Sequence, residues 1–316
     1  MVTQQEKRET RRLQREERER AALAAERRKK LRGYVVAAVL GVAAVSAVVV
    51  AVSSGGGGGG GVGESLASEG GGHVHGLGVN PADGAVFVAS HNGLFRAARG
   101  EAGARPVGRS GKDVMGFSIV GANRFLGSGH PGEGENLPSS LGLIASTDAG
   151  RTFRPVSLLG EVDFHVLRAA GTRVYGSDST SGRFLVSRDE GRTWDAQRPP
   201  GSLIDLAIDP RDPDRLIAST DSGLSASSDG GRSWRRLGEQ IALVAWAAPE
   251  RLFILEQGGK VAVSSDGGRS FRPAGDVRGE PVAFMAAGSE LYVALTDNRI
   301  MRSADGGATW SVRTQV

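Results

Sequence analysis

From residue 73 to the C-terminus, short apolar runs alternate with clusters of glycine, aspartate and serine. Residues 203–239 show the pattern well: the runs LIDLAI, RLIAST, GLSASS and SWRRLG are separated by turn-rich segments such as DPRDPD. Apolar and polar residues that alternate over about four to eight positions, bounded by turn residues, are typical of half-buried β-strands. The pattern therefore predicts an all-β region made of many short strands.

One stretch near the N-terminus departs from this pattern. Tyr34–Val52 (YVVAAVLGVAAVSAVVVAV) is nineteen residues without a charge, and it is apolar on every side. At about 1.5 Å per residue, a helix of this length crosses the hydrocarbon core of a bilayer. Residues 34–52 are therefore predicted to be a transmembrane signal anchor in contact with the lipid bilayer. A cleaved signal peptide is the alternative.

The flanks of this stretch predict its orientation. Residues 1–33 form a basic tail that ends in Arg27, Arg28, Lys29, Lys30 and Arg32, directly before the apolar run. By the positive-inside rule, the tail stays in the cytoplasm and the chain after the anchor is extracytoplasmic. Residues 53–72 contain seven consecutive glycines and are expected to be a flexible linker. The sequence thus predicts a single-pass protein of the cell membrane.

The rest of the chain contains an internal repeat. The pattern S-x-D-x-G-x-[TS]-[WF] occurs five times, with starts 41, 40, 37 and 39 residues apart. Near-constant spacing of this kind is the sequence signature of a repeat architecture. The five octapeptides are STDAGRTF (146–153), SRDEGRTW (187–194), SSDGGRSW (227–234), SSDGGRSF (264–271) and SADGGATW (303–310).

The octapeptide has the chemistry of a tight turn. An aspartate can accept hydrogen bonds from the amides of its own turn, and glycine supplies a backbone conformation that other residues resist. The closing Trp or Phe begins the next strand and can bury its ring between sheets. We therefore give a structural role to the box aspartates and expect the box tryptophans to be core residues. These residues are Asp148, Asp189, Asp229, Asp266 and Asp305, and Trp194, Trp234 and Trp310.

The octapeptides resemble the Asp box, or BNR repeat, of the β-propellers of sialidases, sortilin-type receptors and photosystem assembly factors. The resemblance covers about 240 residues, and it implies that each box links the third and fourth strands of a blade. We predict a six-bladed β-propeller over residues 73–316, whose first blade has lost its box. A strand from residues 62–72 is a possible but unnecessary element of ring closure. The predicted blades are residues 73–108, 113–158, 163–200, 203–239, 241–275 and 282–314.

Charge and composition narrow the range of functions. The net charge is +4, but residues 1–33 hold twelve of the 39 Lys and Arg and six of the 35 Asp and Glu, which leaves 27 basic and 29 acidic residues. The propeller region is therefore slightly acidic, and no nucleic-acid partner is expected. The chain has no cysteine, which excludes disulfides, thiolate metal sites and cysteine nucleophiles.

The five histidines are confined to the first three predicted blades. When first strands are aligned, His75, Met115 and His165 occupy equivalent positions, and His73, Asp113 and Asp163 stand two residues earlier. His91 and His130 follow the second strands of blades 1 and 2. Because residues i and i+2 of a strand point to the same side, and first strands line the channel of a propeller, we expect all these side chains to meet at one channel mouth. Blades 4 to 6 offer only Ile204, Val244 and Phe284 at about the same point.

Imidazoles combined with a thioether favour copper, above all Cu(I), with zinc as the second choice. The candidate ligands are His73, His75, His91, Met115, His130 and His165, and the carboxylates of Asp113 and Asp163 are expected to orient the imidazoles. The alternative is a wet channel without a metal, in a scaffold that binds an extracytoplasmic protein partner.

Glycoside hydrolysis is a third possibility, because sialidases share the box. The sialidase resemblance requires an arginine cluster, a tyrosine nucleophile and acidic partners. Outside the anchor the chain has only Tyr175 and Tyr292, both in predicted second strands. Glu133 and Glu135 lie in a glycine-rich loop, Gly129–Ser140, and are expected to be exposed. No catalytic residue is assigned, and a binding module is favoured over an enzyme.

Overall fold

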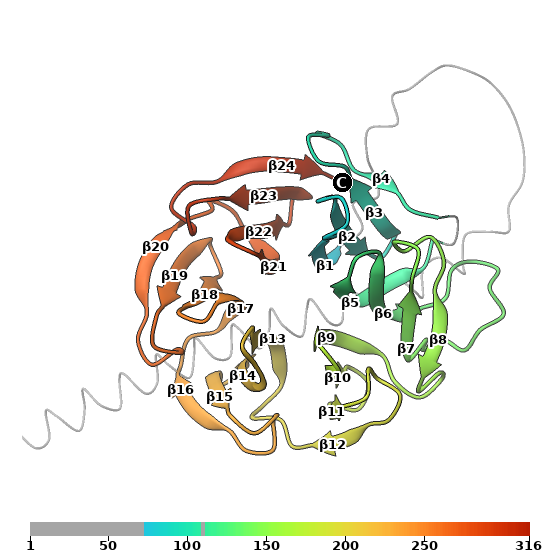
Figure 1. Ribbon diagram of the computed structural model, residues 1–316, viewed down its shortest axis with the longest axis horizontal. Helices are drawn as coiled ribbons and strands as arrows, with labels where there is room; N and C mark the ends of the chain where they lie inside the picture. Colours follow the sequence, from blue (N-terminus) through green and yellow to red (C-terminus); the bar gives the residue numbers. More distant parts are fainter. Residues whose placement is uncertain (1–72, 109–110) are drawn as a thin grey trace, which may run out of the picture. The chain divides into compact units, whose positions relative to one another are not determined.

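The computed structural model describes residues 73–108 and 111–316 of the chain. They form six four-stranded antiparallel sheets, arranged as the blades of a ring (Figure 1). In each sheet the four strands follow one another in sequence order, and the first strand is innermost. The prediction of an all-β, six-bladed β-propeller is therefore confirmed.

The strands fall into six groups of four. Blade 1 contains β1 (Val74–Val79), β2 (Val86–Ser90), β3 (Gly93–Ala97) and β4 (Arg105–Pro106). Blade 2 contains β5 (Asp113–Gly121), β6 (Arg124–His130), β7 (Leu143–Ser146) and β8 (Arg154–Ser157). Blade 3 contains β9 (Phe164–Ala170), β10 (Arg173–Asp178), β11 (Phe184–Ser187) and β12 (Asp195–Gln197).

The remaining blades follow the same plan. Blade 4 contains β13 (Leu203–Asp209), β14 (Asp212–Thr220), β15 (Gly223–Ser227) and β16 (Arg235–Gly238). Blade 5 contains β17 (Ala242–Ala248), β18 (Arg251–Glu256), β19 (Lys260–Ser264) and β20 (Arg272–Asp276). Blade 6 contains β21 (Pro281–Ala287), β22 (Glu290–Leu295), β23 (Arg299–Ser303) and β24 (Ser311–Gln315).

The predicted tail, anchor and linker, residues 1–72, lie outside the described residues. Within the described ranges, no helix has the length and apolar character needed to span a membrane.

The hydrophobic core is divided among the spaces between neighbouring blades. Six clusters of buried side chains each draw on two adjacent blades, and the cluster of Val74, Val86, Ala283 and Tyr292 joins the last blade to the first. The tryptophans of the octapeptides are half-buried and pack against three of these clusters. Because burial of apolar area is the main stabilising term in folding, the blades stabilise one another in pairs around the ring.

Each octapeptide forms the turn between the third and fourth strands of its blade. In blade 3, Ser187 Oγ donates to Asp189 Oδ1 at 2.7 Å and accepts the amide of Gly191 at 2.8 Å. The amide and hydroxyl of Thr193 donate to the two oxygens of Asp189 at 2.9 and 2.7 Å, and these bonds hold the pKa of Asp189 well below its usual range. Equivalent bonds hold the aspartates of the other octapeptides, Asp148, Asp229, Asp266 and Asp305.

The ring closes without an exchanged strand among the described residues. Blade 6 takes all four of its strands from Pro281–Gln315, and its outer strand contacts the segment between β3 and β4 of blade 1. The amide of Ala104 donates to the carbonyl of Gln315 at 3.1 Å, and the guanidinium of Arg313 donates to the carbonyls of Ala98 and Glu101 at 2.6 and 2.8 Å. Closure therefore depends on these contacts and on the shared core of blades 6 and 1.

A β-bulge recurs at one position of the innermost strands. In five of the six, one residue is skipped in the pairing with the second strand, and that extra residue is His75, Met115, His165, Ile204 or Val282. A bulge bends its strand and re-aims the extra side chain. The register thus places His75, Met115 and His165 at the same point of three consecutive blades.

Candidate functional site

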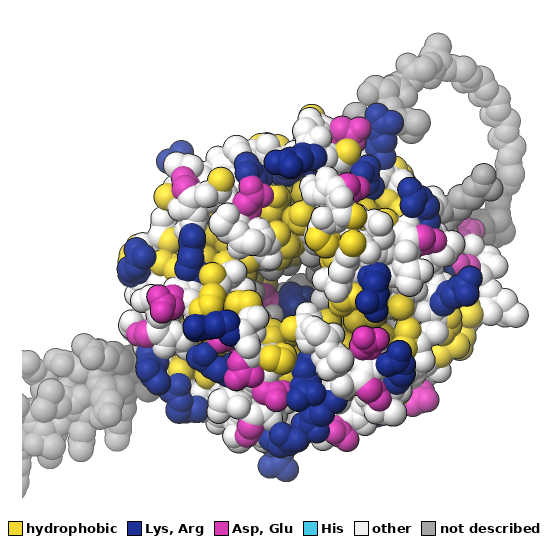
Figure 2. Space-filling model, viewed as in Figure 1, with side chains coloured by type: hydrophobic (Ala, Val, Ile, Leu, Met, Phe, Trp, Pro, Cys, Tyr) yellow, Lys and Arg dark blue, Asp and Glu magenta, His cyan; other side chains and the backbone are white. Residues whose placement is uncertain are grey.

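The centre of the ring is hollow. A cavity of about 560 Å³ runs between the innermost strands, with His75 and His165 in its wall and apolar side chains such as Phe117, Ile119 and Leu243 around much of the rest. Figure 2 shows hydrophobic side chains around the opening of the ring, and no histidine shows on the face drawn there. A cavity of this size, lined by both apolar and polar side chains, is a candidate ligand site.

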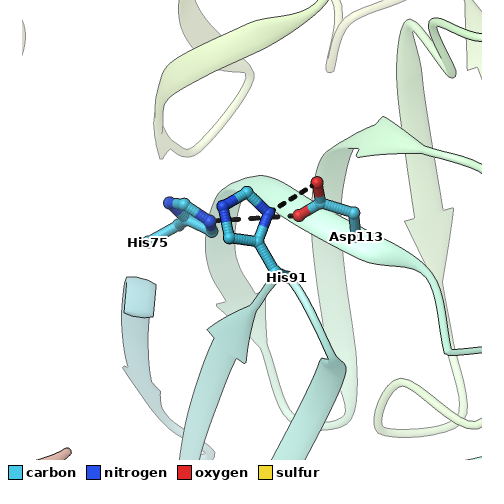
Figure 3. A group of neighbouring side chains, drawn as sticks. All are labelled: His75, His91 and Asp113. Carbon is cyan, nitrogen blue, oxygen red and sulfur yellow. Dashed lines mark hydrogen bonds and ion pairs between the residues drawn. The ribbon is translucent and has the colours of Figure 1, made fainter. Parts of the chain in front are cut away.

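Three side chains from blades 1 and 2 converge beside this cavity. His75 lies in the β1 bulge, His91 follows β2, and Asp113 begins β5. They point toward one another (Figure 3), and one potential ligand atom from each lies within 4.8 Å of the others. The Nδ1–H of His91 donates to Asp113 Oδ2 at 2.8 Å, and His75 Nε2 lies 3.9 Å from Asp113 Oδ1. We call these three residues the inner cluster.

The inner cluster has two unsatisfied polar atoms. His75 Nε2 and Asp113 Oδ1 are both buried, and neither makes a hydrogen bond. The side chains of His75, Asp113 and His91 are 17%, 20% and 24% exposed. Buried polar atoms without partners are costly, so an unsatisfied pair 3.9 Å apart needs a physical explanation.

The pKa values of the two imidazoles of the inner cluster are shifted in opposite directions. Burial, with the charge of His91 as the next cause, lowers the pKa of His75 to about 4 although Asp113 opposes the shift. The hydrogen bond to Asp113 raises the pKa of His91 above its usual value, against the effect of burial. His75 is therefore a neutral imidazole at neutral pH, with a proton on one ring nitrogen and a lone pair on the other. His73 lies at the edge of the cluster, with its ring centre 5.9 Å from that of His91.

A second carboxylate lies beneath two more imidazoles, at the junction of blades 2 and 3. His165 Nε2 lies 2.9 Å and His130 Nε2 lies 3.6 Å from Asp163 Oδ2. Burial raises the pKa of Asp163, but the hydrogen bond and charge of His165 and the charge of His130 together outweigh it, so the pKa lies below its usual value. We call His130, His165 and Asp163 the outer cluster, because both imidazoles are 41% exposed.

The two clusters are neighbours. Asp113 and His130 face each other across the β5–β6 ladder, and the charge of His165 acts on His75. The structure therefore brings all five histidines and both aspartates to one region of the ring. Met115 differs: it occupies the β5 bulge but is only 4% exposed, and it does not line the cavity. The sulfur ligand expected for Cu(I) is thus buried away from the channel.

Two predictions for blades 4 to 6 need correction. Ile204 lines the cavity as expected, but in β17 the lining residue is Leu243 and not Val244, which is 2% exposed. In β21 the bulged residue is Val282, two positions before Phe284, although both reach the cavity. The bulge is present in β21 and absent at this position of β17, and because its extra residue shifts the alternation of sides, the two strands present different positions to the cavity, which the sequence pattern does not reveal.

The glycine-rich loop between β6 and β7 is fixed to the site. Nδ1 of His130 donates to the carbonyl of Ser139 at 2.7 Å, and the ammonium of buried Lys112 pairs with Glu135. Glu133 is exposed as expected, but Glu135 is half-buried, so that expectation was wrong for Glu135. One sequence feature could have indicated this ion pair: Lys112, a charged residue, stands directly before Asp113 at the start of an innermost strand.

An ion pair on the cavity wall was missed by the sequence analysis. Arg168 of β9 donates to Asp205 Oδ1 of β13 at 2.6 Å, and Asp205 is only 2% exposed. Asp205 also accepts the amides of Leu206 and Val244 at 2.8 and 2.9 Å, which ties blade 4 to blade 5. The sequence feature that could have indicated this ion pair is Asp205, a charged residue inside the apolar run LIDLAI.

Neither tyrosine of the propeller reaches the cavity. Tyr175 is fully buried and donates to the carbonyl of Pro213 at 2.7 Å, and burial raises its pKa above its usual value. Tyr292 donates to Glu290 at 2.5 Å, and burial with this hydrogen bond raises its pKa to about 12. A tyrosine nucleophile needs access to the substrate and a lowered pKa, so the described residues do not supply the sialidase arrangement.

The architecture and the central cavity define the chain as a six-bladed β-propeller with a polar channel mouth. No protein-family model matches the chain, and no curated protein sequence matches it. Among solved structures it is similar to the GH74 xyloglucanase from Xanthomonas campestris, at 19% identity over 79% of this chain and 46% of that chain, with a TM-score of 0.51. It is also similar to a chain of a nidogen/laminin complex, at 14% identity over 69% of this chain and 88% of that chain, with a TM-score of 0.54.

YCF48 bound to a D1 peptide is a further structural neighbour, at 18% identity over 77% of this chain and 82% of that chain, with a TM-score of 0.48. At these identities the likeness extends to the fold and not to the chemistry of the site.

Proposed function

We propose that the chain is a membrane-anchored, extracytoplasmic propeller of the Asp-box family that binds a late first-row transition-metal ion at the inner cluster, copper before zinc. The observation that carries the proposal is the pair of buried, unsatisfied atoms, His75 Nε2 and Asp113 Oδ1, with the imidazole of His91 beside them. A metal ion between them would satisfy both atoms at once. Zinc and copper commonly take such imidazole and carboxylate ligands.

The distances support this proposal. A tetrahedral ion with bonds of about 2.0–2.2 Å to nitrogen and oxygen holds its ligand atoms about 3.3 Å apart. His75 Nε2 and Asp113 Oδ1 are 3.9 Å apart, and the ligand atoms of all three residues lie within 4.8 Å. Side-chain shifts of less than 1 Å would therefore complete the site. Because His75 is neutral at neutral pH, its nitrogen is available without the loss of a proton.

The donor set favours divalent copper over Cu(I) in this proposal. With Met115 buried away from the cavity, the available ligands are imidazole nitrogen and carboxylate oxygen. Such donors suit divalent copper and zinc, and the Irving–Williams order places Cu²⁺ above Zn²⁺ for one set of ligands. We therefore propose Cu²⁺ as the preferred ion, where the sequence alone favoured Cu(I).

The proposed membrane anchoring and extracytoplasmic location of the propeller are inferred from the sequence of residues 1–72. The apolar stretch 34–52 and the basic residues before it favour an anchor with a cytoplasmic N-terminus. The glycine-rich segment 53–72 would tether the propeller outside the cytoplasm, where it would meet metal ions or a protein partner.

The test is metal retention by the full-length chain, purified in a mild detergent. After loading with Cu²⁺ and dialysis against a weak chelator, the double variant His75→Ala/His91→Ala should lose one copper equivalent relative to the wild type. Val282→Ala is the matched control, because Val282 occupies the equivalent bulge of β21 without a ligand atom. Circular dichroism checks that the fold persists. Unchanged copper content in a folded double variant would contradict the proposal and favour a metal-free scaffold.

A further inference from the structure

A second pocket lies between blades 4 and 5, away from the histidines. It has a volume of about 420 Å³ and is lined by β14 to β16 of blade 4, by Trp246 of β17 and by the octapeptide turn of blade 5. In a sheet whose strands run up and down in sequence order, the turn after the third strand lies at the opposite end from the turn after the second. This pocket and the inner cluster therefore lie at opposite ends of the blades. Its charged wall contains three arginines, Arg215, Arg235 and Arg269.

Arg215 is fixed in the wall of this pocket. Its Nη1 donates to Asp209 Oδ2 at 2.7 Å, and its guanidinium carbon lies 5.3 Å from the centre of the Trp246 ring. Asp209 is only 1% exposed, so it balances the charge of Arg215. A Cβ built on Gly267 would lie 3.1 Å from Nη2 of Arg215. The lack of a side chain at position 267 therefore keeps this part of the pocket open.

The other two arginines have no partner of their own. Neither the guanidinium of Arg235 nor that of Arg269 makes a hydrogen bond or an ion pair with another described residue, although both line the pocket. Arg269 is an exception among the octapeptide arginines. The others donate to the carbonyl of the aspartate in their own octapeptide at 3.1, 3.1 and 3.2 Å; they are Arg151, Arg192 and Arg232.

The pocket keeps a net positive charge. Among the described residues, Asp266 is the only carboxylate that lines it, and both oxygens of Asp266 accept hydrogen bonds from its own turn. Arg215 is balanced by Asp209, whereas Arg235 and Arg269 together outnumber Asp266. Unpaired positive charge in a pocket raises the local concentration of anions.

The junction of blades 2 and 3 shows what is missing here. The three equivalent positions are also arginines, Arg124, Arg154 and Arg192. There, a carboxylate oxygen of Glu190 lies 4.0 Å from Arg124 and 3.5 Å from Arg192. The residue at the position of Glu190 in the octapeptide of blade 5 is Gly267. The chain thus supplies its own anion at one junction and leaves the same arginine set without one at the other.

We propose that the pocket between blades 4 and 5 binds a phosphate group, either as the free ion or as part of a small soluble phosphate monoester. Guanidinium groups match the oxygens of phosphate and carboxylate in planar pairs of hydrogen bonds. Arg235 and Arg269 come from different blades, so a ligand that contacts both needs oxygens on more than one side, which a phosphate has and a carboxylate lacks. The site shares no residue with the inner cluster, so phosphate binding does not depend on a metal ion.

The test is isothermal titration calorimetry of the metal-free, full-length chain in a neutral detergent at low salt. Inorganic phosphate and phenyl phosphate should each bind at one equivalent, and the tighter of the two identifies the free ion or the monoester as the source. Acetate should bind at least about tenfold more weakly. Since a hydrogen bond to a charged group is worth about tenfold or more in affinity, Arg235→Gln/Arg269→Gln should weaken phosphate binding about a hundredfold. Arg272→Gln is the control, because Arg272 is the equivalent of Arg235 in blade 5 and does not line the pocket.

A second pair of variants keeps all three arginines. Gly267→Glu places at this junction the carboxylate that Glu190 supplies at the other, and Gly267→Gln has nearly the same size without the charge. The backbone accepts either change, because Glu190 already has a φ of 61° where Gly267 has 73°. Gly267→Glu should bind phosphate about tenfold or more weakly than Gly267→Gln, since a like charge beside the ligand opposes binding.

Three results would overturn the phosphate site. They are a wild type that binds neither phosphate probe, a folded Arg235→Gln/Arg269→Gln variant with wild-type affinity, and equal affinities of wild type for acetate and phosphate. Equal phosphate affinities of Gly267→Glu and Gly267→Gln would contradict the role given to the missing carboxylate. Circular dichroism establishes that each variant is folded. None of these results bears on copper retention, so failure here and failure of the proposed function are distinguishable.

Discussion

The ion pair on the cavity wall allows a quantitative test of how the blades are held together. Replacement of Arg168 by Met keeps most of the side-chain volume and removes the guanidinium. The wild-type guanidinium donates to Asp205 at 2.6 Å and to the carbonyls of Leu206 and Leu167 at 3.1 and 3.0 Å. The variant leaves the carboxylate of Asp205 buried, with only the amides of Leu206 and Val244 as partners.

The expected cost follows from these contacts. Two main-chain hydrogen bonds contribute about 1 kcal/mol each. Removal of one partner from a buried ion pair costs about 3–5 kcal/mol, chiefly because the remaining charge is uncompensated. Since these terms overlap, we expect Arg168→Met to lower the free energy of unfolding by about 3–5 kcal/mol near pH 7.5. The double variant Arg168→Met/Asp205→Asn should recover part of this loss, because no charge remains buried.

The loss should depend on pH in one direction. Burial already raises the pKa of Asp205, and the positive charge of Arg168 opposes that shift. Without Arg168 the folded-state pKa rises further, while the unfolded value stays about 3.9. The folded variant therefore binds a proton that the unfolded chain has lost, and the penalty grows as pH rises from the unfolded pKa to the folded pKa. The variant should lose less stability at pH 5 than at pH 7.5.

Urea unfolding followed by tryptophan fluorescence measures both effects on metal-free protein. Arg299→Met is the control, because Arg299 pairs with Asp297 at the surface and should contribute less than about 1 kcal/mol. A loss below 1 kcal/mol for Arg168→Met at pH 7.5, or a loss that is larger at pH 5, would refute the reasoning.

Three further predictions concern the fold. Gly191→Ala should cost more stability in thermal unfolding than Gly171→Ala, by about 1–3 kcal/mol: both glycines have positive φ, but a Cβ at 191 collides with Leu143 and one at 171 meets nothing within 4 Å; equal losses would contradict this. Ser187→Ala should lower the free energy of unfolding by about 1–3 kcal/mol, because it removes the buried acceptor of the Gly191 amide. Urea unfolding measures this loss, and a smaller loss would contradict the prediction. Arg313→Ala should increase hydrogen exchange in β24 and the segment before β4 and leave other blades unchanged, because its guanidinium joins them; unaltered exchange there would show that the shared core alone closes the ring.

The fold was predictable because its signal is local and repeated. Each octapeptide carries its own hydrogen-bond partners, so Ser187, Asp189 and Thr193 form their turn wherever the chain places them. Five such turns at nearly constant spacing leave room for four short strands in each period. Blade 1 has no octapeptide, but its alternating apolar and polar runs were sufficient to predict its position.

The site was predictable only in part, for a geometric reason. The aligned first strands correctly indicated that His75 and His165 face the channel. The same alignment gave Met115 that role, but its side chain is buried, although it occupies the equivalent bulge. A bulge sets where an extra residue sits, whereas the packing of neighbouring blades decides whether its side chain enters the cavity.

Contacts between distant segments account for the rest. Lys112 and Glu135 are 23 residues apart, and Arg168 and Asp205 are 37 residues apart, with strands of one or two blades between them. No local pattern pairs such residues. A charged residue within an apolar strand, as in LIDLAI, indicates that a partner exists but does not identify it.

The repeat explains which positions of the ring are free to carry functional side chains. The box aspartates on five blades accept hydrogen bonds from the amides of their own turns. Using these residues in a functional site would therefore destabilise the turns. The innermost strands are under a weaker constraint, because most side chains at the bulge position face the channel and need only to fit around it. Five of the six equivalent positions line the cavity, and this chain places His75 and His165 on one side and Ile204, Leu243 and Val282 on the other. The imidazoles are therefore confined to the wall of blades 1 to 3, and apolar side chains line much of the wall opposite.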